Sequence, residues 1–184
     1  LSPATLEPRP DTETLIDAVL PLVRERVAAK GSCSIADLGI GTGAIGLALL
    51  AACPEAHCLG IDVSAEAVET ARANAKALEL GARYQAIQGD WLSGIDKRFD
   101  LIVSNPPYIP TADLPSLSRE VTAYDPVLAL DGGADGLDAY RAIAAQAGSR
   151  LEAGGYLALE IGIGQRQSVT ELFAARGFAA AGVF

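Results

Sequence analysis

The sequence predicts an α/β protein with a mostly parallel, twisted sheet and helices on both faces. Segments with strand periodicity alternate with segments of helical periodicity along the whole chain, which is typical of doubly wound sheets. A glycine-rich turn follows the first expected strand, and the long connection 105–135, rich in proline and aspartate, follows the fourth. Ligands bind at the carboxyl ends of strands in such sheets, and long connections there are usually functional.

Each expected element has its own pattern. Apolar residues recur three and four positions apart over 11–30, where Asp11 or Thr12 can cap a helix. Pro54 stops the helix expected at 43–52. The strands are expected at 33–38, 57–62, 83–88, 99–104, 156–161 and 178–184, and the other helices at 65–79, 136–151 and 165–176.

Length and composition indicate one globular domain over residues 1–184. Half of the residues are hydrophobic, and the formal net charge is −9. That charge argues against a sequence-independent grip on nucleic-acid phosphates. The chain has neither an apolar run long enough for a membrane span nor the pattern of a signal peptide.

The content of cysteine and histidine predicts no metal site. Cys33, Cys53 and Cys58 are scattered and are accompanied by a single histidine, His57, which does not make a plausible zinc set. We therefore expect the cysteines to be small apolar residues of a protein in the reducing cytoplasm.

The segment Asp37-Leu38-Gly39-Ile40-Gly41-Thr42-Gly43 predicts a nucleotide-binding turn. Its glycines allow a tight turn and a close approach of the backbone to a ligand, and the following helix adds free N–H groups. A glycine-rich turn followed by an acidic residue fits S-adenosylmethionine and also a dinucleotide, but the G-x-G-x-G spacing is not the full G-x-G-x-x-G of the dinucleotide fingerprint. Asp37 disfavours a pyrophosphate and favours the cationic methionine end of S-adenosylmethionine, or it caps the N–H groups of the turn itself.

Two further segments suit a nucleoside. Asp62 ends the second expected strand, 21 residues after Gly41, where a carboxylate can accept hydrogen bonds from ribose hydroxyls. Gly89-Asp90-Trp91 follows the third strand. Asp90 can accept a hydrogen bond from an adenine amine, and Trp91 either covers the adenine face or is an aromatic residue of the core or rim.

Asn105-Pro106-Pro107-Tyr108 directly follows the fourth expected strand. The two prolines stiffen the backbone and remove two N–H donors, and Asn105 is biased toward an extended conformation because it precedes a proline. The Asn105 side-chain oxygen and nearby carbonyls then form a rim of acceptors, with Tyr108 as an aromatic wall. Such a rim suits a planar –NH2 group.

Together these motifs resemble the class I S-adenosylmethionine-dependent methyltransferases that modify a nitrogen. Over nearly the whole chain they resemble the HemK/PrmC family of release-factor glutamine N5-methyltransferases, since Asn-Pro-Pro-Tyr is accompanied by two more specific segments. These are Pro8-Arg9-Pro10-Asp11-Thr12-Glu13 and the run Asp131 to Tyr140. Leu159-Glu160-Ile161-Gly162 with Gln165 completes the match.

The resemblance implies a Rossmann-like class I methyltransferase fold and methyl transfer to the glutamine of the Gly-Gly-Gln loop of a peptide chain release factor. It implies that Asn105 and the Pro106 carbonyl hold the amide nitrogen, that Pro107 and Tyr108 shape the catalytic site, and that Arg9 and Glu13 lie on the substrate side. The implied cofactor-binding residues are Asp37, Gly39, Ile40, Gly41, Thr42, Gly43, Asp62, Asp90, Trp91 and Asn105.

The chain departs from the family pattern at Asp11 and Asp125, where the family usually has glutamate. Both changes keep the charge and shorten the side chain by one methylene. The family also has a helical N-terminal domain and a further final strand that the chain lacks. We therefore expect 1–184 to be a catalytic domain.

Other functions fit parts of the pattern. A methyltransferase with the same motif could act on a ribosomal-protein glutamine or a nucleic-acid amine, although the charge of −9 weighs against nucleic acid. A nicotinamide-dependent oxidoreductase fits the sheet but not the tight glycine spacing or Asn-Pro-Pro-Tyr. A non-catalytic nucleotide-binding module would keep the fold without the reaction.

Overall fold

The structure is a computed structural model that describes residue 5 and residues 10–118 and 125–182, with only the backbone of 10 and 11. Its centre is a sheet with the strand order β3-β2-β1-β4-β5, in which every pairing is parallel. The strands are β1 Cys33–Leu38, β2 Ala56–Asp62, β3 Tyr84–Gln88, β4 Phe99–Ser104 and β5 Leu151–Leu159.

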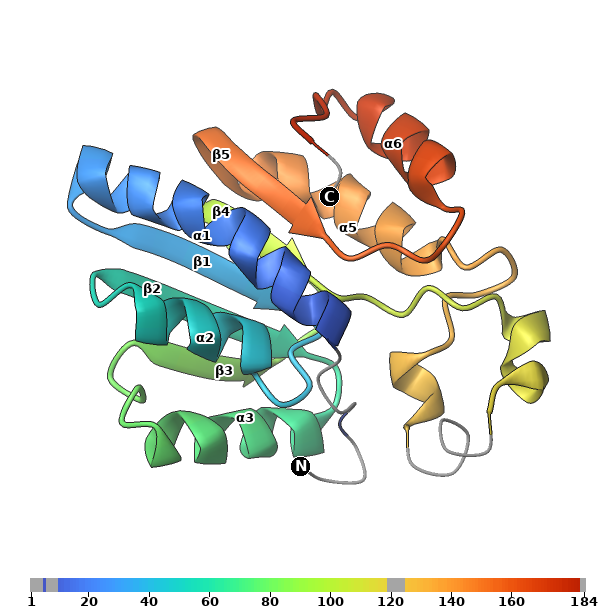
Figure 1. Ribbon diagram of the computed structural model, residues 1–184, viewed down its shortest axis with the longest axis horizontal. Helices are drawn as coiled ribbons and strands as arrows, with labels where there is room; N and C mark the ends of the chain where they lie inside the picture. Colours follow the sequence, from blue (N-terminus) through green and yellow to red (C-terminus); the bar gives the residue numbers. More distant parts are fainter. Residues whose placement is uncertain (1–4, 6–9, 119–124, 183–184) are drawn as a thin grey trace.

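Helices cover both faces of the sheet (Figure 1). The helices α1 Pro10–Lys30, α2 Ala44–Ala52 and α3 Ala65–Ala77 pack on one face, and α5 Asp138–Arg150 and α6 Arg166–Ala174 pack on the other. Neighbouring residues of β1 point to opposite faces of the sheet, since Ile35 packs with the first group of helices and Ala36 with the second. The α/β prediction with helices on both faces is confirmed.

The strand order reverses between β1 and β4, which is where ligands bind in open α/β sheets. These strands end level, because Leu38 pairs with Ser104. The Ser104 hydroxyl also donates a hydrogen bond of 2.7 Å to the Leu38 carbonyl, and both residues are fully buried. The glycine-rich turn leaves β1 and Asn105 leaves β4 at this point, so the two motifs start side by side.

The long connection after β4 is partly ordered by short elements. It contains the 3-10 helices η1 Thr111–Ser116 and η2 Val127–Ala129 and a parallel bridge between Ile109 and Asp131. Asp125 lies between the undescribed residues 119–124 and η2.

The prediction of a strand at 178–184 is wrong for its described part, because residues 178–182 have no strand structure. This run offers only Phe178 followed by alanines and a glycine. The Phe178 ring packs edge-on against Phe173 of α6, with ring centroids 5.4 Å apart. Phe178 therefore extends the core under α6 instead of pairing with the sheet.

The last strand of the sheet, β5, begins at Leu151 rather than at the expected residue 156. Phe99 pairs with Leu151 and Leu101 with Tyr156, so the ladder contains an irregularity at Asp100. Gly154 within it has a φ of 69°, a conformation open mainly to glycine. The pairing thus starts earlier than the apolar pattern of the strand.

We predict that Ser104→Ala lowers the free energy of unfolding by about 1 kcal/mol, because it removes one buried hydrogen bond. Chemical denaturation measures the change. Ser149→Ala is the matched control, since the Ser149 hydroxyl donates to the Gln146 carbonyl at an exposed site. An equal decrease in the free energy of unfolding in the two variants would show that the hydrogen bond between Ser104 and Leu38 stabilises the fold no more than an exposed one.

Candidate active site

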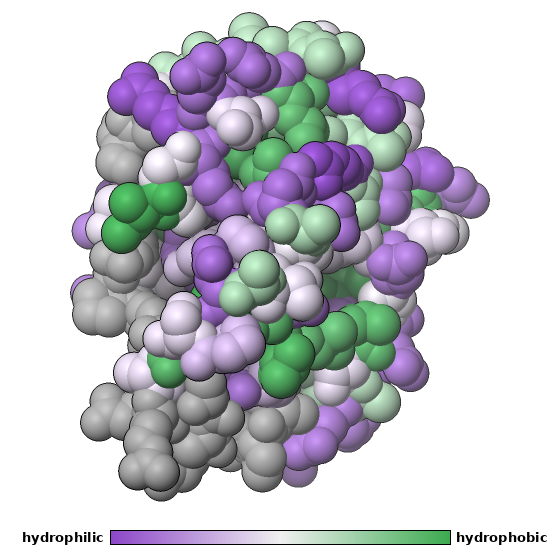
Figure 2. Space-filling view, turned by 90° about the vertical axis from the view of Figure 1, so that its right-hand side faces the viewer, coloured by the Kyte–Doolittle hydropathy of each residue, from purple (hydrophilic) through white to green (hydrophobic). Residues whose placement is uncertain are grey.

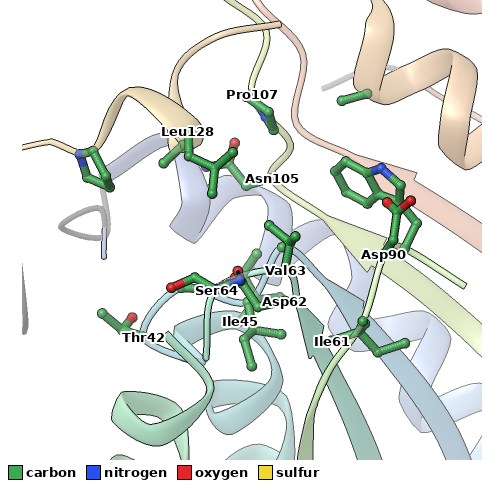
Figure 3. A pocket seen from close by; sticks show the side chains of 18 of the residues that line it. Thr42, Ile45, Ile61, Asp62, Val63, Ser64, Asp90, Asn105, Pro107 and Leu128 are labelled. Carbon is green, nitrogen blue, oxygen red and sulfur yellow. Dashed lines mark hydrogen bonds between the residues drawn. The ribbon is translucent and has the colours of Figure 1, made fainter. Parts of the chain in front are cut away.

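A cavity of about 490 Å³ lies at the carboxyl edge of the sheet, within the range of roughly 300–1,000 Å³ typical of small-molecule sites. The glycine-rich turn, the end of β2, the segment after β3 and the segment after β4 contribute to its wall, and η2 adds Leu128. Figure 3 shows Asn105 and Pro107 across the cavity from Asp62 and Thr42. The structure thus brings together most of the residues that the sequence predicts for the site.

The turn after β1 has the conformation that its glycines allow. Gly39, Gly41 and Gly43 have φ values of 66°, 50° and 80°, which side chains other than glycine rarely adopt. Gly39 and Ile40 donate to the Ile61 carbonyl, at 2.8 and 3.3 Å. The turn therefore bends back over β2, and Gly39, Ile40, Gly41 and Thr42 line the cavity.

Asp62 connects this turn to the end of β2. Its carboxylate accepts hydrogen bonds from the Gly41 N–H at 3.0 Å and the Ser64 N–H at 2.9 Å, one on each oxygen. Each oxygen keeps a second lone-pair direction, and Asp62 lines the cavity. A pair of neighbouring hydroxyls is the chemistry that such a carboxylate can bind.

Asp37 does not line the cavity but lies beneath the turn, where it is 1% exposed. Its Oδ2 accepts from the Gly46 N–H at 2.9 Å, while its Oδ1 is buried without a hydrogen-bond partner among the described residues. Burial raises the pKa of this carboxyl to about 7. Asp37 thus caps the first turn of α2 rather than the N–H groups of the glycine-rich turn itself, and its contact with a cofactor stays a prediction.

Asp90 and Trp91 both line the cavity, with Asp90 exposed and Trp91 half-buried. Trp91 has a positive φ of 50°. An added Cβ on Gly39 would lie 3.8 Å from the Trp91 ring, so the indole lies beside the glycine-rich turn. The exposed side chain of Val63 lines the same cavity, which gives a flat ligand apolar surface.

The four residues after β4 divide between the cavity and its support. Asn105 and Pro107 line the cavity, whereas Pro106 is buried. Tyr108 does not line it. Instead its half-buried ring packs on the α5–α6 side of the core and lines a neighbouring groove. The expectation that Tyr108 forms an aromatic wall of this cavity is therefore corrected.

Gln165 holds the Tyr108 backbone in place. Its Nε2 donates to the Tyr108 carbonyl at 2.9 Å and to the Gly136 carbonyl at 3.2 Å, while its Oε1 accepts from the Gly162 N–H at 3.0 Å. Gly136 has a φ of 74°, and an added Cβ there would clash with the Tyr108 carbonyl oxygen. One glutamine thus joins the segments after β4 and β5 to the loop before α5.

The side chain of Asn105 is held by a residue that the sequence analysis did not assign to the site. Asn105 Nδ2 donates to the Thr12 hydroxyl at 3.3 Å, and that hydroxyl donates to Glu160 Oε2 at 3.0 Å. Thr12 is 5% exposed and lines the cavity. The only signal for Thr12 in the sequence is that it belongs to the segment Pro8 to Glu13. Of the two residues predicted from that segment, Glu13 is exposed and does not line the cavity, and Arg9 lies outside the described residues.

The surface at the carboxyl edge of the sheet is mixed in character. Figure 2 shows this side of the molecule, with hydrophobic side chains in separate groups among hydrophilic ones. Val127 and Leu128 of η2 are both exposed large hydrophobic residues. Within the described part of the chain, no helix combines the length and the apolar character needed to cross a membrane.

Comparisons with known proteins agree with this geometry. The family model of the methyltransferase small domain matches residues 13–119. Release factor glutamine methyltransferases from Agrobacterium fabrum and Bradyrhizobium diazoefficiens are 53% and 52% identical to the chain, over 97% and 95% of its length. The chain covers only 62% and 59% of those relatives.

A solved structure supports the fold. The ribosomal protein L11 methylase from Lactobacillus delbrueckii subsp. bulgaricus aligns with a TM-score of 0.65 and 21% identity, covering 91% of this chain and 69% of that one. The expected Rossmann-like class I methyltransferase fold and the resemblance to release factor glutamine methyltransferases are confirmed.

We predict that Asp37→Asn changes how stability depends on pH. Because burial raises the pKa of Asp37 to about 7, the folded state binds this proton more tightly than the unfolded state. Stability is therefore lost as pH rises from the unfolded pKa toward 7. The unfolding free energy of Asp37→Asn relative to the unmodified chain should rise between pH 5 and pH 8 by on the order of 2 kcal/mol.

Asp100→Asn is the control for this measurement. Burial alone would raise the pKa of Asp100, but hydrogen bonds from Lys30 and Ser34 lower it. Its stabilising contribution is lost only in acid, below the unfolded pKa, so its difference from the unmodified chain should be constant between pH 5 and pH 8. An Asp37→Asn difference that is equally flat over this range would contradict the assignment.

Proposed function

The chain belongs to the methyltransferase small domain family, and on that basis we propose that it transfers a methyl group from S-adenosylmethionine to the N5 of the glutamine in the Gly-Gly-Gln motif of peptide chain release factors. One observation carries the proposal. The Asn105 carboxamide lies on the opposite wall of the cavity from the glycine-rich turn and Asp62. The names and identities of the relatives support the choice of a release factor.

The cavity suits S-adenosylmethionine. In this proposal Asp62 holds the ribose hydroxyls through its remaining lone pairs, and Asp90, Trp91 and Val63 surround the adenine. Thr42 is the turn residue that presents itself to the methionine end, and Asp37 below the turn favours the cationic amine in its ionised form. When bound, S-adenosylmethionine supplies an electrophilic methyl group on a sulfonium.

The role of the chain is to position a weak nucleophile. The lone pair of an amide nitrogen is delocalised into the carbonyl, as the rotation barrier of ~18–20 kcal/mol shows. The Asn105 oxygen and the Pro106 carbonyl accept the two N–H groups of the glutamine, so that its nitrogen faces the methyl group. Pro107 and Leu128 exclude water from the same wall.

Alignment is the larger contribution in this mechanism. Positioning supplies ~7–11 kcal/mol, which exceeds the ~10²–10⁴-fold from a positioned general base. No base is needed before attack, because the methylated nitrogen is strongly acidic and loses its proton to solvent afterwards. The site therefore needs acceptors in fixed positions rather than a group that titrates near neutral pH.

The other functions considered above are not favoured by these comparisons. In this proposal the enzyme acts in the cytoplasm, because its substrate is a protein that takes part in translation. The relatives are longer than this chain, and in this proposal the segments that they have in addition contribute to binding of the release factor.

We predict that Gly41→Val abolishes binding of S-adenosylmethionine. Gly41 has a positive φ of 50° and lines the cavity, so a side chain there both strains the turn and fills the site. Gly31→Val is the matched control, because Gly31 also has a positive φ, of 78°, and open space around it, but lies away from the cavity. Calorimetric titration should show lost affinity for the first variant alone, and unchanged affinity in Gly41→Val would refute the cofactor site.

We predict that the full-length natural protein adds one methyl group to the motif glutamine of a release factor, and that Asn105→Ala lowers kcat roughly 10²-fold or more because the nitrogen is no longer aligned. Mass spectrometry of the release factor measures both. A release factor with glutamate at the motif position is the substrate control. Methylation of ribosomal protein or DNA instead, or an unaffected kcat in Asn105→Ala, would overturn the proposal.

A further inference from the structure

Three segments far apart in the sequence meet in one chain of hydrogen bonds. Glu160 follows β5, Thr12 lies in the first turn of α1, and Asn105 follows β4. The separations along the sequence are 148 residues between Thr12 and Glu160 and 93 between Thr12 and Asn105. Thr12, in the middle, is 5% exposed, and its hydroxyl has these two side chains as hydrogen-bond partners.

The chemistry of the three groups fixes the direction of every hydrogen bond. A threonine hydroxyl has one proton, and a carboxylate can only accept. The Thr12 proton therefore points to Glu160, and the hydroxyl presents only lone pairs to Asn105. A carboxamide has a donating and an accepting end that its partners distinguish. Only the –NH2 end of Asn105 can face Thr12.

This direction determines what Asn105 offers to the cavity. Its Nδ2 is engaged by Thr12, and its Oδ1 accepts no hydrogen bond from any described residue. A rotation of the carboxamide by half a turn would place two acceptors against each other at Thr12. It would also present a donor to an incoming –NH2 group, where an acceptor is needed.

We propose that Thr12 and Glu160 are positioning residues that hold the Asn105 carboxamide with its oxygen toward the substrate nitrogen. The effect on catalysis rests on the proposed function, whereas the orientation of the carboxamide does not. Glu160 sets the Thr12 hydroxyl, Thr12 sets Asn105, and neither touches the reacting atoms in this scheme. The pair acts on the fraction of the enzyme that can align the substrate.

We predict that Thr12→Val lowers kcat at saturating substrate at least about tenfold, because it keeps the shape of the side chain and removes the hydroxyl. Thr12→Ser keeps the hydroxyl and should retain nearly all activity. Thr14→Val is the matched control, since Thr14 is exposed on the same helix. The affinity for S-adenosylmethionine and the thermal midpoint should stay close to those of the unmodified protein in all three variants.

Glu160→Gln tests the direction of the relay. Its amide can donate to the Thr12 hydroxyl, which frees the hydroxyl proton to turn toward Asn105 and reverse the carboxamide. We expect kcat to fall, and the double variant Thr12→Val/Glu160→Gln to be no slower than Thr12→Val alone, because both changes act through one path. Two purely structural losses would instead multiply.

The orientation itself is measured without any substrate, by nuclear Overhauser contacts between the Asn105 side-chain –NH2 protons and the Thr12 side chain in the full-length natural protein. The proposal is supported if these contacts are present in the unmodified protein and if Thr12→Ser keeps a kcat close to that of the unmodified protein. Absence of these contacts, full activity in Thr12→Val, or equal losses in Thr12→Val and Thr12→Ser would overturn it. A protein that shows the contacts but leaves release factor unmethylated would contradict only the proposed function.

Discussion

The site depends on the level ends of β1 and β4. The Ser104 hydroxyl bonds the Leu38 carbonyl at 2.7 Å in the middle of the sheet, where neither group can exchange its partner for water. Gly39 and Asn105 are the next residues of the two strands. Any slip of one strand against the other would move the glycine-rich turn relative to Asn105, and the two walls of the cavity would no longer face each other.

The polar groups around the cavity follow one principle, in which the backbone or a neighbouring side chain uses part of each group and leaves the rest for a ligand. Asp62 accepts two backbone N–H groups and keeps further lone pairs. Asn105 donates a hydrogen bond from Nδ2 to Thr12, and its Oδ1 is left to accept one from a ligand. Gln165 instead uses both ends of its carboxamide on protein partners, so it supports the site rather than presenting a group to it.

Local patterns were sufficient to predict β1 to β4 and the glycine-rich turn, and to place Asp62 and Asn105 at the ends of strands, because each of these follows from periodicity or from a short motif at the end of a strand. Thr12 could not be assigned in this way, since its partners are 93 and 148 residues away and the motif containing it offered the charged Arg9 and Glu13 as more obvious candidates. The proximity of Tyr108 to Asn105 in the sequence predicts that its ring lines the cavity, yet the ring packs against the core on the side of α5 and α6. The strand expected at 178–184 is absent from its described part for a similar reason, because the contact of Phe178 with Phe173 decides the conformation of that segment.

A crystal structure of the full-length protein with S-adenosylhomocysteine and a peptide containing Gly-Gly-Gln tests the central claim most directly. The account predicts that the glutamine side-chain nitrogen lies within hydrogen-bond distance of Asn105 Oδ1, while Asn105 Nδ2 still contacts Thr12. A glutamine that presents its oxygen to Asn105 Nδ2, or a peptide bound away from the cavity between Asn105 and the glycine-rich turn, would contradict it.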